Sequence, residues 1–119
     1  MTGRKQFRPE TRLRQPGEFS AVLSGRQRLR GEWFELCFGR PGGTSARLGL
    51  VIPKRLARRA VMRNLAKRLA REAFRDVRTQ LPMMDLVLRL SRAATSTATR
   101  DLPKVWRREI DLLLSRLPK

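Results

Sequence analysis

The spacing of hydrophobic and polar residues changes several times along this chain, and each spacing predicts a different element. Phe19, Val22 and Leu23 are spaced as on one face of a helix. Pro16 precedes them and Gly25 follows, which is the usual placement of proline and glycine around a helix. The pattern predicts a helix of about two turns.

Two short runs then have the composition of β-strands. The run WFELCF at 33–38 is rich in aromatic residues and alternates between two faces. A second run, at 47–52, follows a segment rich in glycine and proline at 39–43. The two runs are therefore predicted to form an antiparallel hairpin, with Pro53 ending the second strand. The segment 26–31 leaves room for one more strand.

The longest helical pattern begins after Pro53. Its apolar positions recur every four residues: Val61, Leu65, Leu69 and Ala73. Basic residues recur at the same interval on another side of the helix: Arg63, Lys67, Arg71 and Arg75. The pattern predicts an apolar stripe that faces a sheet and a separate basic ridge, which is about 15 Å long at 1.5 Å per residue.

Two more elements are predicted near the C-terminus. Leu81-Pro82 ends the long helix, and DLVLRL at 85–90 is typical of a largely buried strand. The small residues of 93–99 predict a loop, with Thr99 as a candidate N-cap for a last helix. That helix has its apolar residues at helical spacing: Leu102, Trp106, Ile110, Leu113, Leu114 and Leu117.

The predicted order is helix, strand, strand, helix, strand and helix, with 26–31 as a further strand before the first of these strands. It indicates one α+β domain, a compact two-layer α/β sandwich with helices on one face of a sheet. Residues 1–12 are polar and basic and are predicted to form a mobile arm. Residues 13–117 are predicted to form the folded domain.

The net charge of the chain indicates which kind of partner it binds. The 119 residues include 28 Lys and Arg against 10 Asp and Glu, a formal charge of +18, which is typical of nucleic-acid-binding proteins. The longest apolar run, 48–52, is too short to cross a membrane, and no apolar segment follows the basic N-terminus. Neither a membrane partner nor a secretory signal is expected, and the predicted location is the cytoplasm.

The chain has few residues suited to catalysis. Cys37 is the only cysteine and histidine is absent, which excludes an internal disulfide and a zinc site of Cys and His. A protein that cleaves RNA by itself would usually employ His, or carboxylates clustered around metal ions. The ten acidic residues show no such clustering. No catalytic residue is predicted.

Basic residues are densest around the long helix. Ten lie between Lys54 and Arg78, against only Glu72 and Asp76. A charge run is most often a solvated face, but the one-sided placement and the few acidic partners favour contact with nucleic acid. The pattern does not distinguish RNA from DNA.

The run GLVIPKRLARRAVMRNLAKRLAREAFR, at 49–75, resembles the signature of the protein subunit of bacterial ribonuclease P. That signature centres on an Arg-Asn-Arg helix and a basic segment ending in Glu-x-Phe-Arg. RLRQPGEFSAVL upstream and LPMMDLVLRLSRAA downstream are similar to the family in order and spacing. The resemblance covers nearly all of residues 12–117.

The resemblance implies an RNA-dependent enzyme that removes the 5′ leader from precursor tRNA. It implies that a large RNA subunit performs the hydrolysis with Mg²⁺ and that this protein assists. The implied partners are ribonuclease P RNA and precursor tRNA, with no DNA partner. The family fold is an α/β sandwich with a left-handed βαβ crossover, an exception to the usual handedness.

The resemblance also assigns residues to the contact with the catalytic RNA. Arg63 and Asn64 match the first two positions of Arg-Asn-Arg, whereas Leu65 replaces the second arginine. The full set expected to bind the catalytic RNA is Lys54, Arg55, Arg58, Arg59, Arg63, Asn64, Lys67, Arg68 and Arg71.

In the family, a cleft between the first helix and the sheet holds the single-stranded leader. Aromatic side chains suit this role because stacking on bases tolerates sequence variation. Phe19 matches a cleft aromatic, and Leu23 stands where a second phenylalanine is common. Trp33 and Phe38 are expected to supply further contacts, while core packing is favoured for Phe34, Phe74 and Trp106.

Two other functions remain open at this point. A small ribosomal protein would also be basic and bind RNA without catalysis. A DNA-binding helix-turn-helix module is the weakest alternative, because strands stand where its first helix would be.

Overall fold

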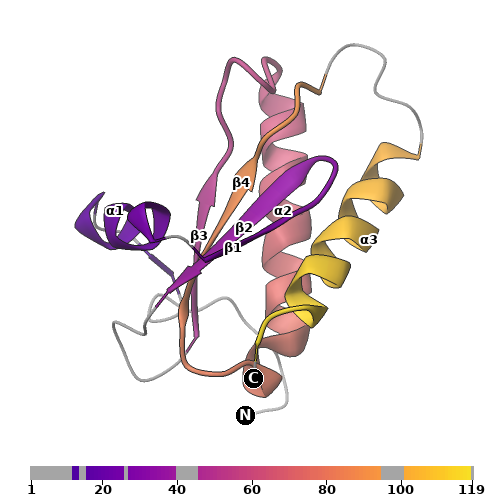
Figure 1. Cartoon of the computed structure of the whole chain (residues 1–119). Helices are drawn as coiled ribbons and strands as arrows, with labels where there is room; N and C mark the ends of the chain where they lie inside the picture. Colours follow the sequence, from indigo (N-terminus) through magenta and orange to yellow (C-terminus); the bar gives the residue numbers. More distant parts are fainter. Residues whose placement is uncertain (1–11, 14–15, 26, 40–45, 95–100, 119) are drawn as a thin grey trace.

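The structure is a computed structural model that describes residues 12–13, 16–25, 27–39, 46–94 and 101–118 (Figure 1). The elements, in chain order, are α1 (Pro16–Ser24), β1 (Arg28–Arg30), β2 (Phe34–Gly39), β3 (Arg47–Val51), α2 (Ala60–Val77), the 3-10 helix η2 (Arg78–Gln80), β4 (Asp85–Leu90) and α3 (Leu102–Ser115). The predicted order is confirmed, and the segment 26–31 does contain a strand, β1.

The described strands form one sheet in the order β1-β2-β4-β3. β4 is antiparallel to β2 and parallel to β3, so β3, α2 and β4 make the βαβ unit that the family resemblance implies. The predicted hairpin between β2 and β3 is wrong, because β4 lies between them. The central place suits β4, since a strand with apolar residues on both faces must be covered on both.

The two faces of the sheet are covered by different helices. α2 and α3 pack on one face, and α1 packs on the other, as Figure 1 shows. Helices on a single face were predicted, and this holds for α2 and α3 only. The alternation of β2 explains the arrangement, because Leu36 belongs to the core under α2 and α3 while Cys37 belongs to a small cluster under α1.

The core between the sheet, α2 and α3 contains most of the large buried side chains. Phe34 and Trp106 meet edge to face, with ring centroids 5.4 Å apart, and both are fully buried. Phe74 is fully buried in the same core. The core assignment of these three aromatic residues is confirmed.

The apolar stripe of α2 is rotated from the predicted one. Its buried residues are Ala66, Leu69, Ala70, Ala73 and Phe74. Val61, predicted on the stripe, is 65% exposed. A strict four-residue interval advances about 40° around the helix at each step, so a row that faces the sheet at Leu69 has turned away from it at Val61. Leu65 is half-buried and packs against the core.

α3 is attached to the β1–β2 turn by a carboxylate. The backbone N–H groups of Glu32, Trp33 and Phe34 donate to the Glu109 carboxylate over 2.7–2.9 Å. A Cβ at Gly31 would lie 2.6 Å from the carboxyl carbon of Glu109, so a larger residue there would displace this carboxylate. The contact joins the sheet to a helix 75 residues further along the chain.

All six predicted apolar positions of the last helix are buried. Thr99, the predicted N-cap, lies outside the described residues, and Asp101 occupies the N-cap position of α3. Among the described helices, none is both long enough and apolar enough to cross a membrane.

Candidate nucleic-acid interface

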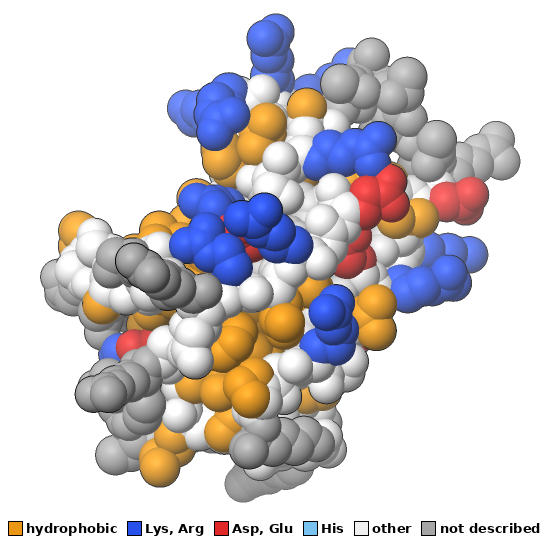
Figure 2. Space-filling view, in the orientation of Figure 1, with side chains coloured by type: hydrophobic (Ala, Val, Ile, Leu, Met, Phe, Trp, Pro, Cys, Tyr) orange, Lys and Arg blue, Asp and Glu red, His pale blue; other side chains and the backbone are white. Residues whose placement is uncertain are grey.

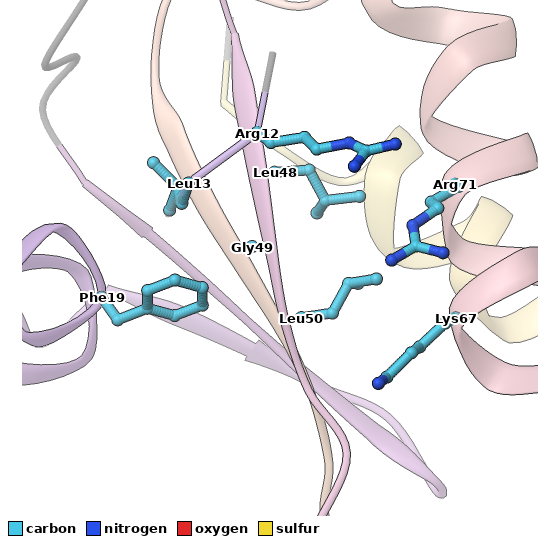
Figure 3. A pocket seen from close by; sticks show the side chains of 8 residues that line it. All are labelled: Arg12, Leu13, Phe19, Leu48, Gly49, Leu50, Lys67 and Arg71. Atoms are coloured by element: carbon cyan, nitrogen blue, oxygen red, sulfur yellow. The ribbon is translucent and has the colours of Figure 1, made fainter. Parts of the chain in front are cut away.

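A pocket of about 160 Å³ lies across the outer edge of β3. Three parts of the chain contribute to it: α1, β3 with the residues paired to it, and α2 (Figure 3). Its lining residues are Arg12, Leu13, Phe19, Leu48, Gly49, Leu50, Lys67 and Arg71. Phe19 and Leu13 reach it on the α1 side of the strand, whereas Lys67 and Arg71 point to it from α2.

Phe19 occupies space that only a glycine leaves open. A Cβ built on Gly49 would lie 2.5 Å from Cε1 and 2.7 Å from Cζ of the Phe19 ring. Because atoms cannot approach so closely, the ring packs directly on the bare backbone of β3. Phe19 remains half-buried, so part of the ring is accessible at the pocket. A pocket therefore borders Phe19, the residue that the family resemblance assigns to the leader cleft.

The chain before α1 is paired with β3. Arg12 forms a parallel bridge with Leu48, and the Leu13 N–H donates to the Leu48 carbonyl over 3.1 Å. Leu13 is buried against α1 and the sheet. The predicted mobile arm therefore does not extend to residue 12, and residues 1–11 lie outside the described residues.

The pocket combines positive charge with an aromatic ring. Arg12, Lys67 and Arg71 line it, and none of the eight described lining residues is acidic. Burial lowers the pKa of the Arg71 guanidinium, and the charge of Arg12 lowers it further. Like charges held this close repel one another, and a bound anion would relieve the repulsion. The arrangement suits a phosphate next to a stacked base.

Arg63 organises the turn that precedes α2. Its Nη1 donates to the Ala57 carbonyl over 2.9 Å and to the Arg58 carbonyl over 2.8 Å. The Leu56 and Ala57 N–H groups donate to the Pro53 carbonyl, and Ala57 is fully buried. This turn holds four exposed cations: Lys54, Arg55, Arg58 and Arg59. Arg63 thus positions the neighbouring basic residues.

The exposed side of α2 carries two further predicted contacts. Asn64 and Arg68 are exposed, and Arg68 pairs with Glu72 at 3.3 Å. Leu65 packs against the core instead, so the position where the family has its second arginine is an apolar contact in this chain. The predicted ridge is therefore divided: Arg63 turns to the backbone, while Lys67 and Arg71 turn to the pocket.

Two residues assigned to the leader cleft lie elsewhere. Phe38 is buried in the core under α2 and α3. Trp33 also packs on that core, edge to face with Trp106 at 6.0 Å, and Arg92 stacks on its ring. Phe38 follows the strand alternation to the other face of the sheet, and Trp33 precedes β2, so alternation does not apply to it. Leu23 is half-buried with the small cluster under α1.

Sequence analysis missed Arg12, Leu13 and Gly49 as pocket residues. Gly49 interrupts the apolar run 48–52, and an isolated glycine in a strand often marks a close approach of another group. Arg12 and Leu13 gave no comparable signal, because their pairing with β3 depends on where the chain enters the fold.

Within the described residues, no three His, Cys, Asp or Glu side chains gather as a metal site would require. Glu35 and Asp85, the buried acids, lie against arginines; Asp85 holds Arg47 through two hydrogen bonds of 2.9 and 2.8 Å. These two buried carboxylates are therefore bound by arginines rather than gathered as the oxygen ligands that Mg²⁺ requires.

The sequence model of the family Ribonuclease P matches residues 7–116 of this chain. The chain belongs to the ribonuclease P protein family. The ribonuclease P protein component of Bordetella petrii is 46% identical over 115 residues, covering 92% of this chain and 93% of the relative. That of Azoarcus sp. strain BH72 is 42% identical over 115 residues, covering 97% and 92%.

A solved ribonuclease P protein has the same fold. The protein from Thermotoga maritima is 28% identical and superposes with a TM-score of 0.75, covering 91% of this chain and 98% of that chain. Membership of the ribonuclease P protein family makes this chain a component of a ribonuclease ribonucleoprotein. The comparisons do not support a ribosomal protein.

Proposed function

We propose that this chain binds ribonuclease P RNA through α2 and the turn before it, and the 5′ leader of precursor tRNA through the pocket at the β3 edge. The observation that carries the proposal is the pocket itself, which the Phe19 ring lines on one side of β3 while Arg12, Lys67 and Arg71 line it on the other (Figure 3). An aromatic face and several cations are what a single-stranded RNA needs for its bases and its phosphates.

Catalysis is proposed to reside in the RNA subunit, with Mg²⁺ bound there. Among the described acids, Glu35 and Asp85 are bound by arginines and Glu109 by backbone amides, and the sequence contains no histidine to move a proton. The protein's contribution is binding and orientation: its cations offset the repulsion between two RNAs, and its pocket holds the leader beside the catalytic RNA. The complex is proposed to act in the cytoplasm.

Reconstitution tests this function. The protein is mixed with a bacterial ribonuclease P RNA and precursor tRNA at low Mg²⁺, where charge neutralisation by protein should matter most. We expect leader removal by the mixture and none by the protein alone. Absence of stimulation would refute the function, and cleavage by the protein alone would refute catalysis by RNA.

Arg68→Ala tests the α2 contact with the catalytic RNA. Arg68 is exposed and its pair with Glu72 is a surface pair, so stability should change by less than about 0.5 kcal/mol. Affinity for ribonuclease P RNA should fall about tenfold, with a shallower dependence on salt. Arg108→Ala, at an exposed position on α3, is the matched control and should leave affinity unchanged. Equal losses in both variants would mean that only total charge matters.

Phe19→Ala tests the leader pocket. Removing the ring should weaken binding of precursor tRNA by about 1–3 kcal/mol, the usual contribution of one stacked base, and leave binding of mature tRNA unchanged. The measurement is a titration of the reconstituted complex with each RNA. An equal loss of affinity for both RNAs would refute the assignment of the leader to this pocket.

A further inference from the structure

The α1 side of the sheet has a second basic group, separate from the pocket. Three arginines of β1 and β4 surround one carboxylate of β2: Arg28, Arg30 and Arg89 each pair with Glu35. Figure 2 shows basic side chains gathered over β1 and β2, with an acidic side chain beneath them. These four residues are called the arginine cluster below.

The register of the sheet places the arginine cluster next to the pocket. Arg30, Glu35, Arg89 and Val51 are aligned across the four strands. Gly49, against which the Phe19 ring packs, lies two residues before Val51 and so belongs to the neighbouring row on the same face. Two residues along a strand span about 7 Å, so the rows are adjacent. An extended RNA strand on this face can contact both.

The cluster has more positive charge than its carboxylate needs. One arginine would neutralise Glu35, whose side chain is only 8% exposed. Three leave a formal excess of +2 on a few square nanometres of surface. The Arg30 side chain is 75% exposed, and such an ion pair contributes only about 0–1 kcal/mol to stability, so folding alone gives little reason for an arginine at this position.

The three arginines differ in what they can offer a ligand. Arg28 is largely buried, and its Nη2 donates to the Leu23 and Gly25 carbonyls at the end of α1, so it positions the helix. The Arg30 side chain is 75% exposed and reaches Glu35 through Nε at 3.1 Å, and that of Arg89 is 36% exposed. Glu35 thus orients two guanidinium groups whose outer donors face solvent.

We infer that Arg30 and Arg89 bind the phosphate backbone of the precursor tRNA leader after it leaves the Phe19 pocket. This inference rests on the proposed function, because it needs the leader in the pocket. The cluster lies on the face of the sheet that α1 covers. Arg68 and the turn before α2, which are proposed to bind the catalytic RNA, lie on the other side of the edge strand β3. The leader, rather than the catalytic RNA, therefore meets these arginines.

The test uses the complex reconstituted with ribonuclease P RNA and a series of precursor tRNAs whose leaders differ by single nucleotides. For Arg30→Gln, affinity should fall about fivefold for long leaders, and the salt slope should decrease by about 0.7, the value for one single-strand phosphate. Leaders too short to pass the pocket should bind as to the wild type. Arg89→Gln should show the same dependence on length.

Arg108→Gln is the matched control and should bind every leader as the wild type does. A loss in Arg30→Gln that is equal for all leaders and for mature tRNA would overturn the inference and assign the arginine to the catalytic RNA. Lower thermal stability with unchanged binding would overturn it as well. If the wild-type complex itself does not prefer precursor over mature tRNA, this result refutes the proposed leader pocket, and with it the inference about the arginine cluster.

Discussion

The two faces of the sheet are built from the same strands but differ in depth and in chemistry. The face under α2 and α3 has a broad core with Phe34, Phe74 and Trp106 fully buried. Among the described residues, the face under α1 has a small cluster of four buried hydrophobic side chains, Leu13, Val22, Cys37 and Val87, and the Phe19 pocket and the arginine cluster lie next to it. Most of the described buried core therefore lies on one face, whereas the Phe19 ring and the arginine cluster, which are proposed to bind the leader, lie on the other.

This division follows from how much of each face is covered. α2 and α3 together cover a broad core on their face, and the pocket reaches that side only at the edge strand, at Leu48, Leu50, Lys67 and Arg71. The short α1 covers only part of its face, and the remaining strand residues stay accessible to RNA. A small protein can thus bind a polyanion with one side of a sheet whose other side maintains the fold.

The largest expected effect comes from Phe34→Ala. Deleting this ring from the main core should lower the free energy of unfolding by about 3–5 kcal/mol. Phe19→Ala, on the other face, should cost far less because its ring is half-buried. Urea unfolding of both variants measures the difference. Equal losses would show that α1 contributes as much stability as the main core.

The next effect concerns Glu109, which holds the β1–β2 turn on the α3 side. Glu109→Ala leaves the N–H groups of Glu32, Trp33 and Phe34 without this acceptor and should lower stability by about 2–3 kcal/mol. Binding of leaders too short to reach Arg30 should not change, since Glu109 does not line the Phe19 pocket. Asp111→Asn, which affects a surface pair with Arg107, is the control and should cost below about 1 kcal/mol. A smaller loss in Glu109→Ala than in the control would contradict the assignment.

A smaller effect on stability, but a clear one on binding, is expected for Gly49→Ala. The new methyl group would displace the Phe19 ring from β3, costing about 1–2 kcal/mol and weakening leader binding as Phe19→Ala does. Gly39→Ala is the control on the same face, because its Cβ would lie 3.9 Å from the nearest atom of Val22, an ordinary contact. Unfolding and precursor titrations of both variants are compared. Unchanged leader binding in Gly49→Ala would show that leader binding does not depend on the position of the Phe19 ring on β3.

The smallest effect is a difference in thiol reactivity. Burial raises the pKa of the Cys37 thiol, and the nearby Glu35 carboxylate raises it further, so the thiol stays protonated and slow to react in the folded protein. Cys37 lies under α1, and α1 should open more easily than the main core. Labelling with a thiol reagent should therefore proceed faster than global unfolding allows. Labelling limited to the rate of global unfolding would show that both faces open together.

The ionisation of Cys37 makes the stability of the folded protein decrease as pH rises. Because the folded protein raises the pKa of this thiol, the unfolded chain ionises first as pH rises. Stability from this group is complete below the ordinary thiol pKa and decreases above it. Cys37→Ala should remove this part of the alkaline loss of stability.

The local sequence pattern was enough to identify most helices and strands, but not to predict which strands pair with each other. The apolar run of β4 and the helical spacing in α3 correctly identified both, because each reflects how a single element is buried. The hairpin between β2 and β3 failed because strand pairing depends on the whole sheet, and β4 competes for the same edge of β2.

The candidate site was predicted in part for the same reason. Phe19 was predicted to bind the leader and Lys67 and Arg71 to bind the catalytic RNA, and the structure brings all three to one pocket. Phe38 was misplaced because its face was not fixed until the sheet was known. The arginine cluster joins three strands, and nothing within any one of them marks it.

The sequence by itself determined that this protein is basic, has one α+β domain and carries the ribonuclease P protein signature on a cationic helix. These properties depend on composition and local periodicity, which need no partner elsewhere in the chain. Only the tertiary structure decided that β4 separates β2 from β3, that Leu65 packs inward and that Phe19 rests on Gly49. Each of these depends on contacts between segments far apart in the chain, whose geometry is set when the sheet and helices pack together.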